Sequence, residues 1–566
     1  INGKFESVKS WNPEFPTLYN MVFTLKKSDE VTHVKKERIG FRTVELRQHD
    51  GFYVNGKRII FKGVNRHSFW PETGRCLSEV NHLQDIALMK EMNMNAVRMS
   101  HYPPDKRFLE LCDSLGLFVF NEVTGWQDGY DTIVGPKLIR ETVLRDENHP
   151  CVVVWDHGNE GGWDFRNEKW FHKFDIQNRP VIYPWLAKNG VDALHYPAFD
   201  SYVQRFDNGD KPFVPTEFLH GLYDGGHGAG LDDYWTSYEK SPLFSGAFLW
   251  NFTDEAVLRT DLEGTVLDGD GNHAPDGILG PHREKEGSFY TIRRIWSPVQ
   301  VMPLTVNPLW DGQMLIKNKY LYTDLAGCSF KWEVIKTDLS KNTKLVADGV
   351  VSGKAAVPGE TRSYKIEQAL PFLTKGDLFS FTAIDVKGEE ICTWTWPIVQ
   401  PYEKAKELIN KEEFAENEIE LIENDKDIFV SVDDFNLRFD KNTGELLHVN
   451  KAGKNISLSG GTQIEGFESK ITGVDWGYNE TGEFILKVNY DKFPKYITWR
   501  LQKDGWLFYE AGALNQKMND IDYLGISFNY PEENCTGITW MGQGPYRVWK
   551  NRTLGNNLGV WQKDYN

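Results

Sequence analysis

Residues 47 to about 305 alternate short apolar runs with amphipathic stretches, the pattern of repeated strand and helix units. The runs predict strands covered on both faces, and residues 80–92 predict a helix because their apolar residues recur on one face. The eight predicted strands span 58–64, 95–99, 117–121, 152–155, 180–183, 192–196, 213–217 and 246–250. Eight units in about 250 residues, without Gly-x-Gly-x-x-Gly after the first strand, favour a closed (β/α)8 TIM barrel over an open doubly wound sheet.

The flanks of this region have a different pattern. Residues 1–46 and 306–400 contain runs with alternating polarity, such as 329–335, which predict β-sandwich domains. Residues 401–424 are highly charged and predict a linker or a solvated helix. Residues 425–566 predict a further, incomplete β domain. The expected architecture is therefore multidomain, with the barrel at 47–305 between β-rich parts.

Composition narrows the class of partner. The formal net charge of −17 argues against nucleic acid, and no run of 18 apolar residues predicts a membrane span. Six cysteines without Cys-x-x-Cys or zinc spacing indicate free thiols or at most one disulfide. The chain starts inside a strand-rich segment without a visible signal peptide, so we interpret it as a cut or processed piece whose compartment cannot be inferred.

Candidate chemistry gathers where the predicted strands end, the face on which barrel enzymes place their active sites. The stretch VVVWDHGNEGGWD delivers Glu160 into a glycine-rich loop, where it either caps the next element or performs chemistry. Polar side chains follow most of the other strands too. They are Asn65, Arg66, His67, Arg98, Ser100, His101, Tyr102, Asn121, Glu122, Asn159, His195, Tyr196, Glu217, His220, Trp250 and Asn251.

This set favours cleavage of a glycosidic bond. One carboxyl group must protonate the leaving oxygen while an ionised one attacks the anomeric carbon, and paired glutamates satisfy both needs. Trp250, Tyr196 and Trp163 are candidates for packing against sugar rings. The chain has no Gly-x-Ser-x-Gly elbow, phosphate-binding loop or His-Glu-x-x-His motif. An inactive barrel that binds carbohydrate is the alternative from another functional class.

Five long stretches resemble glycoside hydrolase family 2, and within it the large bacterial β-galactosidases. They are KGVNRHSFWPETG, MKEMNMNAVRMSHYPPDKRFLELCDSLGLFVFNE, NHPCVVVWDHGNEGG, PFVPTEFLHG and SGAFLWNFTDEAV. The resemblance implies a barrel flanked by immunoglobulin-like β-sandwiches and a C-terminal β-supersandwich. It also implies that a leading jelly-roll and the end of the last domain are absent here, so we expect an open pocket and weak or no activity.

The resemblance also implies residue roles. Glu160 matches the acid/base and Glu217 the nucleophile, with Arg98 holding Glu217 ionised. The implied substrate-binding residues are His67, Arg98, His101, Glu122, Asn159, Tyr196, His220 and Trp250. Where the family has a Glu and a His that hold magnesium, this chain has Trp126 and Asp128. We therefore expect chemistry that requires no cofactor, with Mg²⁺ or Na⁺ left open.

The sequence thus predicts a retaining exo-β-glycosidase, with β-galactosidase as first choice and β-glucuronidase, β-mannosidase or arabinopyranosidase as alternatives. Its expected partner is an oligo- or polysaccharide, and a homo-oligomer is left open. The motif GGWD after Glu160 differs from the family and predicts a different leaving group. Retention requires the carboxyl groups of Glu160 and Glu217 to lie roughly 5 to 5.5 Å apart, and we expect one of them to keep its proton near neutral pH.

Overall fold

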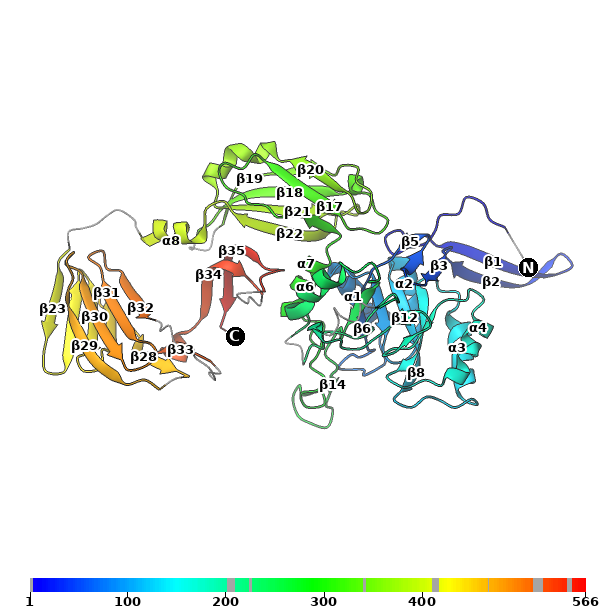
Figure 1. The fold of residues 1–566 in the computed structure, drawn as a ribbon, viewed down its shortest axis with the longest axis horizontal. Coiled ribbons are helices and arrows are strands. Elements are labelled where there is room, and N and C mark those ends of the chain that lie inside the picture. The colour runs from blue at the N-terminus through cyan, green and yellow to red at the C-terminus, as the bar shows by residue number, and fades with distance from the viewer. Residues whose placement is uncertain are drawn as a thin grey trace. The chain divides into compact units, whose positions relative to one another are not determined.

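The computed structural model describes residues 4–200, 209–222, 226–338, 343–409, 417–466, 468–512, 523–546 and 552–565. The chain divides into two compact units, one of residues 1–398 with 541–560 and one of residues 399–540 with 561–566. The elements of both units are drawn in Figure 1. Among the described helices, none is long and apolar enough to cross a membrane. All six cysteines lie in described segments as free thiols, which agrees with one of the two alternatives.

A curled parallel sheet forms the centre of the first unit (Figure 1). In spatial order its strands are β10 (Val181–Ile182), β9 (Val152–Asn159), β8 (Phe118–Trp126), β7 (Ala96–Met99), β6 (Phe61–Arg66) and β13 (Gly246–Leu249). The predicted sixth and seventh strands are less regular. They contribute β12 (Val191–Asp192) and isolated parallel bridges, Asp192–Phe213, His195–Glu217 and Phe218–Leu249. These bridges extend the sheet beyond β13 in the order expected for a TIM barrel.

Helices connect and cover these strands. They are α1 (Glu79–Glu91), α2 (Lys106–Leu115), α3 (Gly135–Asp146), α4 (Lys169–Phe174), α6 (His227–Tyr238) and α7 (Gly287–Ile295). The predicted helix 80–92 corresponds to α1, which Ser78 and Asn81 begin with a reciprocal capping box. Helix α2 ends at Gly116, whose φ of 82° is a left-handed conformation that favours glycine. Short strands complete the barrel region: β11 (Ala187–Lys188), β14 (Val257–Leu258) and β15 (Leu267–Asp268).

Antiparallel sheets flank the barrel along the chain. The hairpin β1 (Tyr19–Lys27) and β2 (Glu30–Ile39) and the sheet β3 (Val44–Arg47), β4 (Gly51–Val54) and β5 (Lys57–Arg58) precede it. After it come one sheet of β16 (Val299–Val301), β17 (Gln313–Asn318) and β20 (Thr361–Lys365), and another of β19 (Lys344–Ser352), β18 (Ser329–Lys336), β21 (Leu378–Ile384) and β22 (Glu390–Pro397). Residues of these last two sheets share one hydrophobic core, separate from the barrel core.

The second unit is also antiparallel. One sheet orders β23 (Ile419–Glu423), β24 (Asp427–Val432), β25 (Phe435–Asp440), β26 (Leu446–Lys451), β28 (Ser459–Glu465) and β33 (Gly525–Asn529), with β27 (Lys454–Ile456) paired to β26. A second contains β29 (Ile471–Tyr478), β30 (Phe484–Tyr490), β31 (Tyr496–Leu501) and β32 (Leu507–Gly512). A further antiparallel pair, β34 (Gly537–Gly544) with β35 (Asn557–Asp564), has residues assigned to each of the two units.

The predicted charged linker 401–424 contains regular structure at both ends. Helix α8 (Pro401–Ile409) begins it, and strand β23 of the second unit ends it. Residues 410–416 lie outside the described segments. The assignment of the β domains to immunoglobulin-like and supersandwich folds, and the predicted domain boundaries, stay predictions.

Candidate active site

Arg98 organises the centre of the barrel mouth from strand β7. Its side chain is fully buried, and all five of its N–H donors have a partner. The acceptors are Asp156 Oδ2 at 2.6 Å, Asn65 Oδ1 at 2.9 Å, Glu217 Oε1 at 2.8 Å, Glu122 Oε2 at 2.5 Å and Asn159 Oδ1 at 2.9 Å. One guanidinium therefore fixes five side chains delivered by four segments of the barrel, β6, β8, β9 and the segment that ends at Glu217.

The carboxyl groups of Asp156, Glu122 and Glu217 all contact this one guanidinium, and their pKa values are shifted in different directions. Burial raises the pKa of Glu122 to about 8 and that of Asp156 to about 7, in spite of their ion pairs with Arg98. Burial also opposes ionisation of Glu217, but His195, Arg98 and His101 together with the Tyr196 hydroxyl lower the pKa of Glu217 to about 2. Glu217 is thus the carboxylate that the site keeps ionised, as the sequence led us to expect.

Glu217 and Glu160 approach each other across the pocket. Tyr196 donates to Glu217 Oε2 at 2.7 Å, and His195 Nδ1 lies 2.9 Å from Glu160 Oε1 and 3.5 Å from Glu217 Oε2. One oxygen of each carboxylate and a ring nitrogen of His195 all lie within 4.8 Å of one another. The two carboxylates are therefore close enough for both to reach the same anomeric carbon.

Glu160 differs from the expectation that it would hold a proton near neutral pH. Its pKa is lowered, chiefly by the hydrogen bond with His195 and further by one from Trp126, whose indole Nε1 lies 3.3 Å from Oε2. Both donors favour the ionised form. The residue itself is half-buried at the end of β9 with φ 44°, a left-handed conformation that is uncommon for a non-glycine residue.

The glycines around Glu160 bring two loops into backbone contact. A Cβ on Gly162 would lie 2.0 Å from the carbonyl carbon of Gly125, and one on Gly158 would lie 2.1 Å from the Gly162 oxygen. The loop that carries Glu160 is thereby pressed against the end of β8, which carries Trp126.

The pocket between these groups has a volume of about 800 Å³. Predicted residues that line it are His67, His101, Asn159, Glu160, Tyr196, Glu217, His220 and Trp250. Arg98 and Glu122, predicted to bind substrate, instead lie beneath the pocket floor, where they support the residues above. Trp163 packs against Tyr183 and Phe165 and is not among the lining residues.

Aromatic rings build one wall of the pocket. The ring of His101 is stacked on Trp250 with centroids 5.1 Å apart, and His67 meets both rings edge-on. The indole of Trp250 donates to Asp276 Oδ2 at 2.9 Å. Burial raises the pKa of Asp276 to about 7. This wall combines flat apolar faces with polar edges, as sugar binding requires.

Sequence reasoning missed several residues of this site. His195 was noted at a strand end but received no role, although it contacts both carboxylates. Asp156 was passed over inside the apolar run before Glu160, yet an acid in a buried strand is itself a signal, because buried carboxylates need partners. Tyr102 was likewise noted at a strand end without a role, whereas Asp276 and Arg75 come from loops, for which the sequence carried no signal.

The magnesium that the family resemblance implied does not fit the residues beside Glu160. The Trp126 indole is a hydrogen-bond donor and cannot ligate a metal, and it already occupies Glu160 Oε2. In the described part of the chain, two groups of metal-binding side chains cluster: Glu160, His195 and Glu217, and separately Asp113, His149 and Cys151. Asp128 belongs to neither group.

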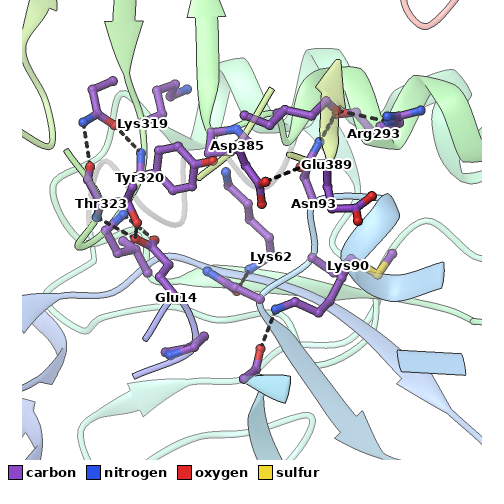
Figure 2. A pocket seen from close by; sticks show the side chains of 18 of the residues that line it. Glu14, Lys62, Lys90, Asn93, Arg293, Lys319, Tyr320, Thr323, Asp385 and Glu389 are labelled. Atoms are coloured by element: carbon purple, nitrogen blue, oxygen red, sulfur yellow. Dashed lines mark hydrogen bonds between the residues drawn. The ribbon is translucent and has the colours of Figure 1, made fainter. Parts of the chain in front are cut away.

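A second, larger cavity of about 950 Å³ lies where the strands of the barrel begin (Figure 2). Residues from the N-terminal ends of β6, β7 and β8 meet residues of the β domain that follows the barrel. Glu14 accepts hydrogen bonds there from the backbone N–H groups of residues 321–323. This end of a TIM barrel serves stability rather than chemistry, so the pocket at the mouth is the candidate site.

Two models of protein families match parts of this chain. Residues 44–269 match the model described as glycosyl hydrolases family 2, TIM barrel domain, and residues 2–42 match the model described as glycosyl hydrolases family 2. A protein named β-galactosidase from Priestia megaterium is 26% identical over 99% of this chain and 60% of its own length. One of the same name from Oenococcus oeni is 28% identical over 98% of this chain and 61% of its own length.

Among solved structures, a glycosyl hydrolase family 2 member from Bacteroides cellulosilyticus is similar over 87% of this chain and 68% of that chain, with 20% identity and a TM-score of 0.44. The chain spans about 60% of the length of the curated relatives named above.

Proposed function

Because the chain belongs to glycoside hydrolase family 2, we propose that its barrel mouth is the site of a retaining exo-β-glycosidase, with terminal β-galactosides as its substrates. The observation that carries the proposal is the pair of carboxylates, Glu160 and Glu217, with oxygen atoms within 4.8 Å of each other. Retaining glycosidases separate their carboxyl groups by about 5 to 5.5 Å, whereas inverting enzymes need about 6.5 to 9.5 Å for an intervening water.

In the first step, ionised Glu217 attacks the anomeric carbon while Glu160 gives a proton to the glycosidic oxygen, so that the bond to the leaving group breaks. The low pKa of Glu217 suits the nucleophile. Glu160 must gain a proton before this step, and exclusion of water by a bound leaving group would raise the pKa of Glu160 toward neutral.

In the second step, water attacks the glycosyl–Glu217 ester and Glu160 takes its proton, which releases the sugar and restores both groups. The hydrogen bonds from His195 and Trp126 to Glu160 favour the ionised base that this step needs. All groups used in both steps are side chains of this chain, and the proposed chemistry uses no cofactor.

The galactoside choice draws on the names of the relatives and on two acids behind Trp250. Asp276 accepts from the Trp250 indole and lies near Glu255 through their common partner Asn251. A uronate carboxylate would gain no cationic partner from these two acids, whose pKa values are raised by burial. β-Glucuronidase is nevertheless the second candidate, because the pocket is also lined by exposed Arg75, whose guanidinium lies over the rings of Phe69 and Tyr102 and can pair with a carboxylate.

A panel of nitrophenyl β-galactoside, β-glucuronide, β-mannoside and arabinopyranoside tests the sugar. We expect the galactoside to have the highest kcat/KM. Turnover of the glucuronide alone would replace the first candidate with the second, and binding of glycans without release of any sugar would make the protein a carbohydrate-binding barrel.

Trapping tests the residue roles even where turnover is slow. A 2-deoxy-2-fluoro glycosyl fluoride should label Glu217, as peptide mass spectrometry would show. Glu160→Gly, which suits the left-handed backbone there, should be rescued by azide for substrates with good leaving groups. A label on any other residue would remove Glu217 from the role of nucleophile.

A further inference from the structure

Trp126 stands out among the residues of the pocket because its large apolar side chain is 61% exposed. It is the last residue of β8, and it lines the pocket on the side of Glu160. Its indole N–H donates to Glu160 Oε2, the acid/base carboxylate of the proposed function. A flat ring placed beside the proton donor lies where the departing part of a substrate must sit.

The indole is positioned by backbone rather than by a packed core. Trp126 is in parallel register with Asn159, and it forms an antiparallel bridge with Asp128. The adjoining contact between Gly125 and Gly162 leaves no space for a side chain on either residue. The backbones of Trp126 and Glu160 are therefore held side by side, and the hydrogen bond from the indole N–H joins the ring to the carboxylate.

A hollow of about 470 Å³ continues the pocket past Trp126. It is lined by residues 124–126, 128–130 and His101, and Tyr130 within it is 42% exposed. Two exposed aromatic side chains with hydroxyl and carboxylate groups between them suit a pyranose ring, whose C–H face is apolar and whose edge carries hydroxyl groups.

We propose that Trp126 and this hollow form the leaving-group subsite, which takes a neutral pyranose ring stacked on the indole. The inference rests on the proposed function, because it places the glycosidic oxygen at Glu160. It also assigns Trp126 as a positioning residue: the indole that holds the leaving sugar also orients the carboxyl group that protonates it. In the step concerned, the proton moves from Glu160 to the glycosidic oxygen, the bond from that oxygen to the anomeric carbon breaks, and the leaving sugar departs with a hydroxyl group.

The test compares two substrates that differ only in their leaving group, a β-galactosyl-glucose disaccharide and β-galactosyl fluoride. The fluoride has no ring for Trp126 to hold and needs little acid assistance. Trp126→Ala should lower kcat/KM for the disaccharide at least roughly tenfold more than for the fluoride, the size expected for one aromatic stacking contact. Equal loss on both substrates, or no loss on either, would overturn the subsite.

Trp126→Phe separates the two roles of the indole, because it keeps a flat face and removes the N–H donor. We expect KM for the disaccharide to stay near that of the wild type. The alkaline limb of the kcat/KM profile, where Glu160 loses the proton that it must donate, should move to higher pH because Glu160 loses a hydrogen-bond donor that favours its ionised form. Trp506→Phe removes an exposed indole from the second unit and is the matched control, with neither change expected. An unmoved pH profile in Trp126→Phe would refute the positioning role.

A binding measurement keeps this inference separable from the proposed function. In Glu217→Gln protein, calorimetric titration with the disaccharide should show weaker binding when Trp126→Ala is added and nearly unchanged binding when Trp126→Phe is added. If the wild type cleaves neither substrate and the fluorosugar does not label Glu217, the proposed function fails, and this titration alone decides whether the subsite exists. Equal affinity in all three proteins would refute it.

Discussion

The two ends of the barrel both hold a cavity lined by charged side chains, and they differ in where those charges find their partners. At the end where strands begin, the Lys62 ammonium donates to the Trp296 carbonyl and the Lys90 ammonium donates to the Gly116 carbonyl. Arg293 donates to carbonyl groups of residues 390 and 391. At the mouth, Glu160 is half-buried and Trp126 is exposed beside it.

The comparison shows that cavity volume is a poor guide to function in this protein. The larger cavity joins two domains through hydrogen bonds that are already made, whereas the guanidinium beneath the smaller one binds carboxyl groups whose pKa values are driven apart. Glu217, with a pKa of about 2, contacts the same guanidinium as the buried Glu122, with a pKa of about 8. Divergent pKa values at one site are a mark of acid/base chemistry.

The largest expected difference between the two ends is in catalysis. Glu217→Gln should lower kcat at least roughly a thousandfold, since it removes the attacking carboxylate. Lys62→Met, at the opposite end, should change kcat less than about twofold because the amine donates to a backbone carbonyl, that of Trp296, and does not line the pocket at the mouth. Initial rates on a nitrophenyl glycoside measure both. A large loss of activity in folded Lys62→Met protein would contradict the expectation that only the mouth end of the barrel contributes to catalysis.

The buried acids beneath the mouth should make stability depend on pH. The pKa of Asp156 rises from an ordinary 3.8 to about 7, so the folded chain holds this proton more tightly than the unfolded chain. Its contribution to stability is therefore complete below about pH 4 and is lost as pH rises through about 7. Asp156→Asn should reduce the number of protons released on unfolding by about one in this window.

Urea unfolding monitored between pH 4.5 and 8.5 measures that change. Glu217 makes stability depend on pH in the opposite direction, because its pKa is lowered in the folded chain. Its contribution to stability is present above about pH 4.5 and is lost as pH falls toward 2. A pH dependence in Asp156→Asn identical to that of the wild type would contradict the assignment of a protonated acid beneath the pocket.

At the opposite end, Glu14→Gln should lower stability without affecting chemistry. The Glu14 carboxylate accepts from the backbone N–H groups of residues 321–323 and from the Thr323 hydroxyl. Glutamine keeps only one acceptor oxygen, so we expect a loss of about 1–3 kcal/mol. The urea midpoint measures this loss, and kcat at 25 °C should stay within about twofold. A fall in kcat with an unchanged midpoint would contradict this division of roles.

The smallest expected effect is that of metal removal. Because Trp126 occupies the Glu160 oxygen that a neighbouring ion would use, treatment with EDTA should change kcat/KM less than about twofold. Rates before and after chelation, and again after adding magnesium, measure it. A loss that magnesium restores would show that an ion binds beside Glu160 in spite of the indole.

Much of the fold follows from local pattern. The predicted helix 80–92 and the strands at 95–99, 117–121, 152–155 and 246–250 correspond closely to α1, β7, β8, β9 and β13. The prediction of a strand at 213–217 was less accurate, because this segment forms isolated bridges rather than a regular strand. The ends of strands identified Glu160 and Glu217 as candidates, since parallel strands place their last residues on one face.

The sequence by itself determined the order of strands and helices and the kinds of side chain at their ends, because apolar periodicity and chain order are local properties. Only the tertiary structure decided that His195 lies between the two carboxylates, that Arg98 satisfies five acceptors from beneath the pocket, and that glycines press the loops of Trp126 and Glu160 together. These features depend on distances between segments up to 119 residues apart and on burial, which sets the pKa values. Burial and proximity exist only once the chain is folded.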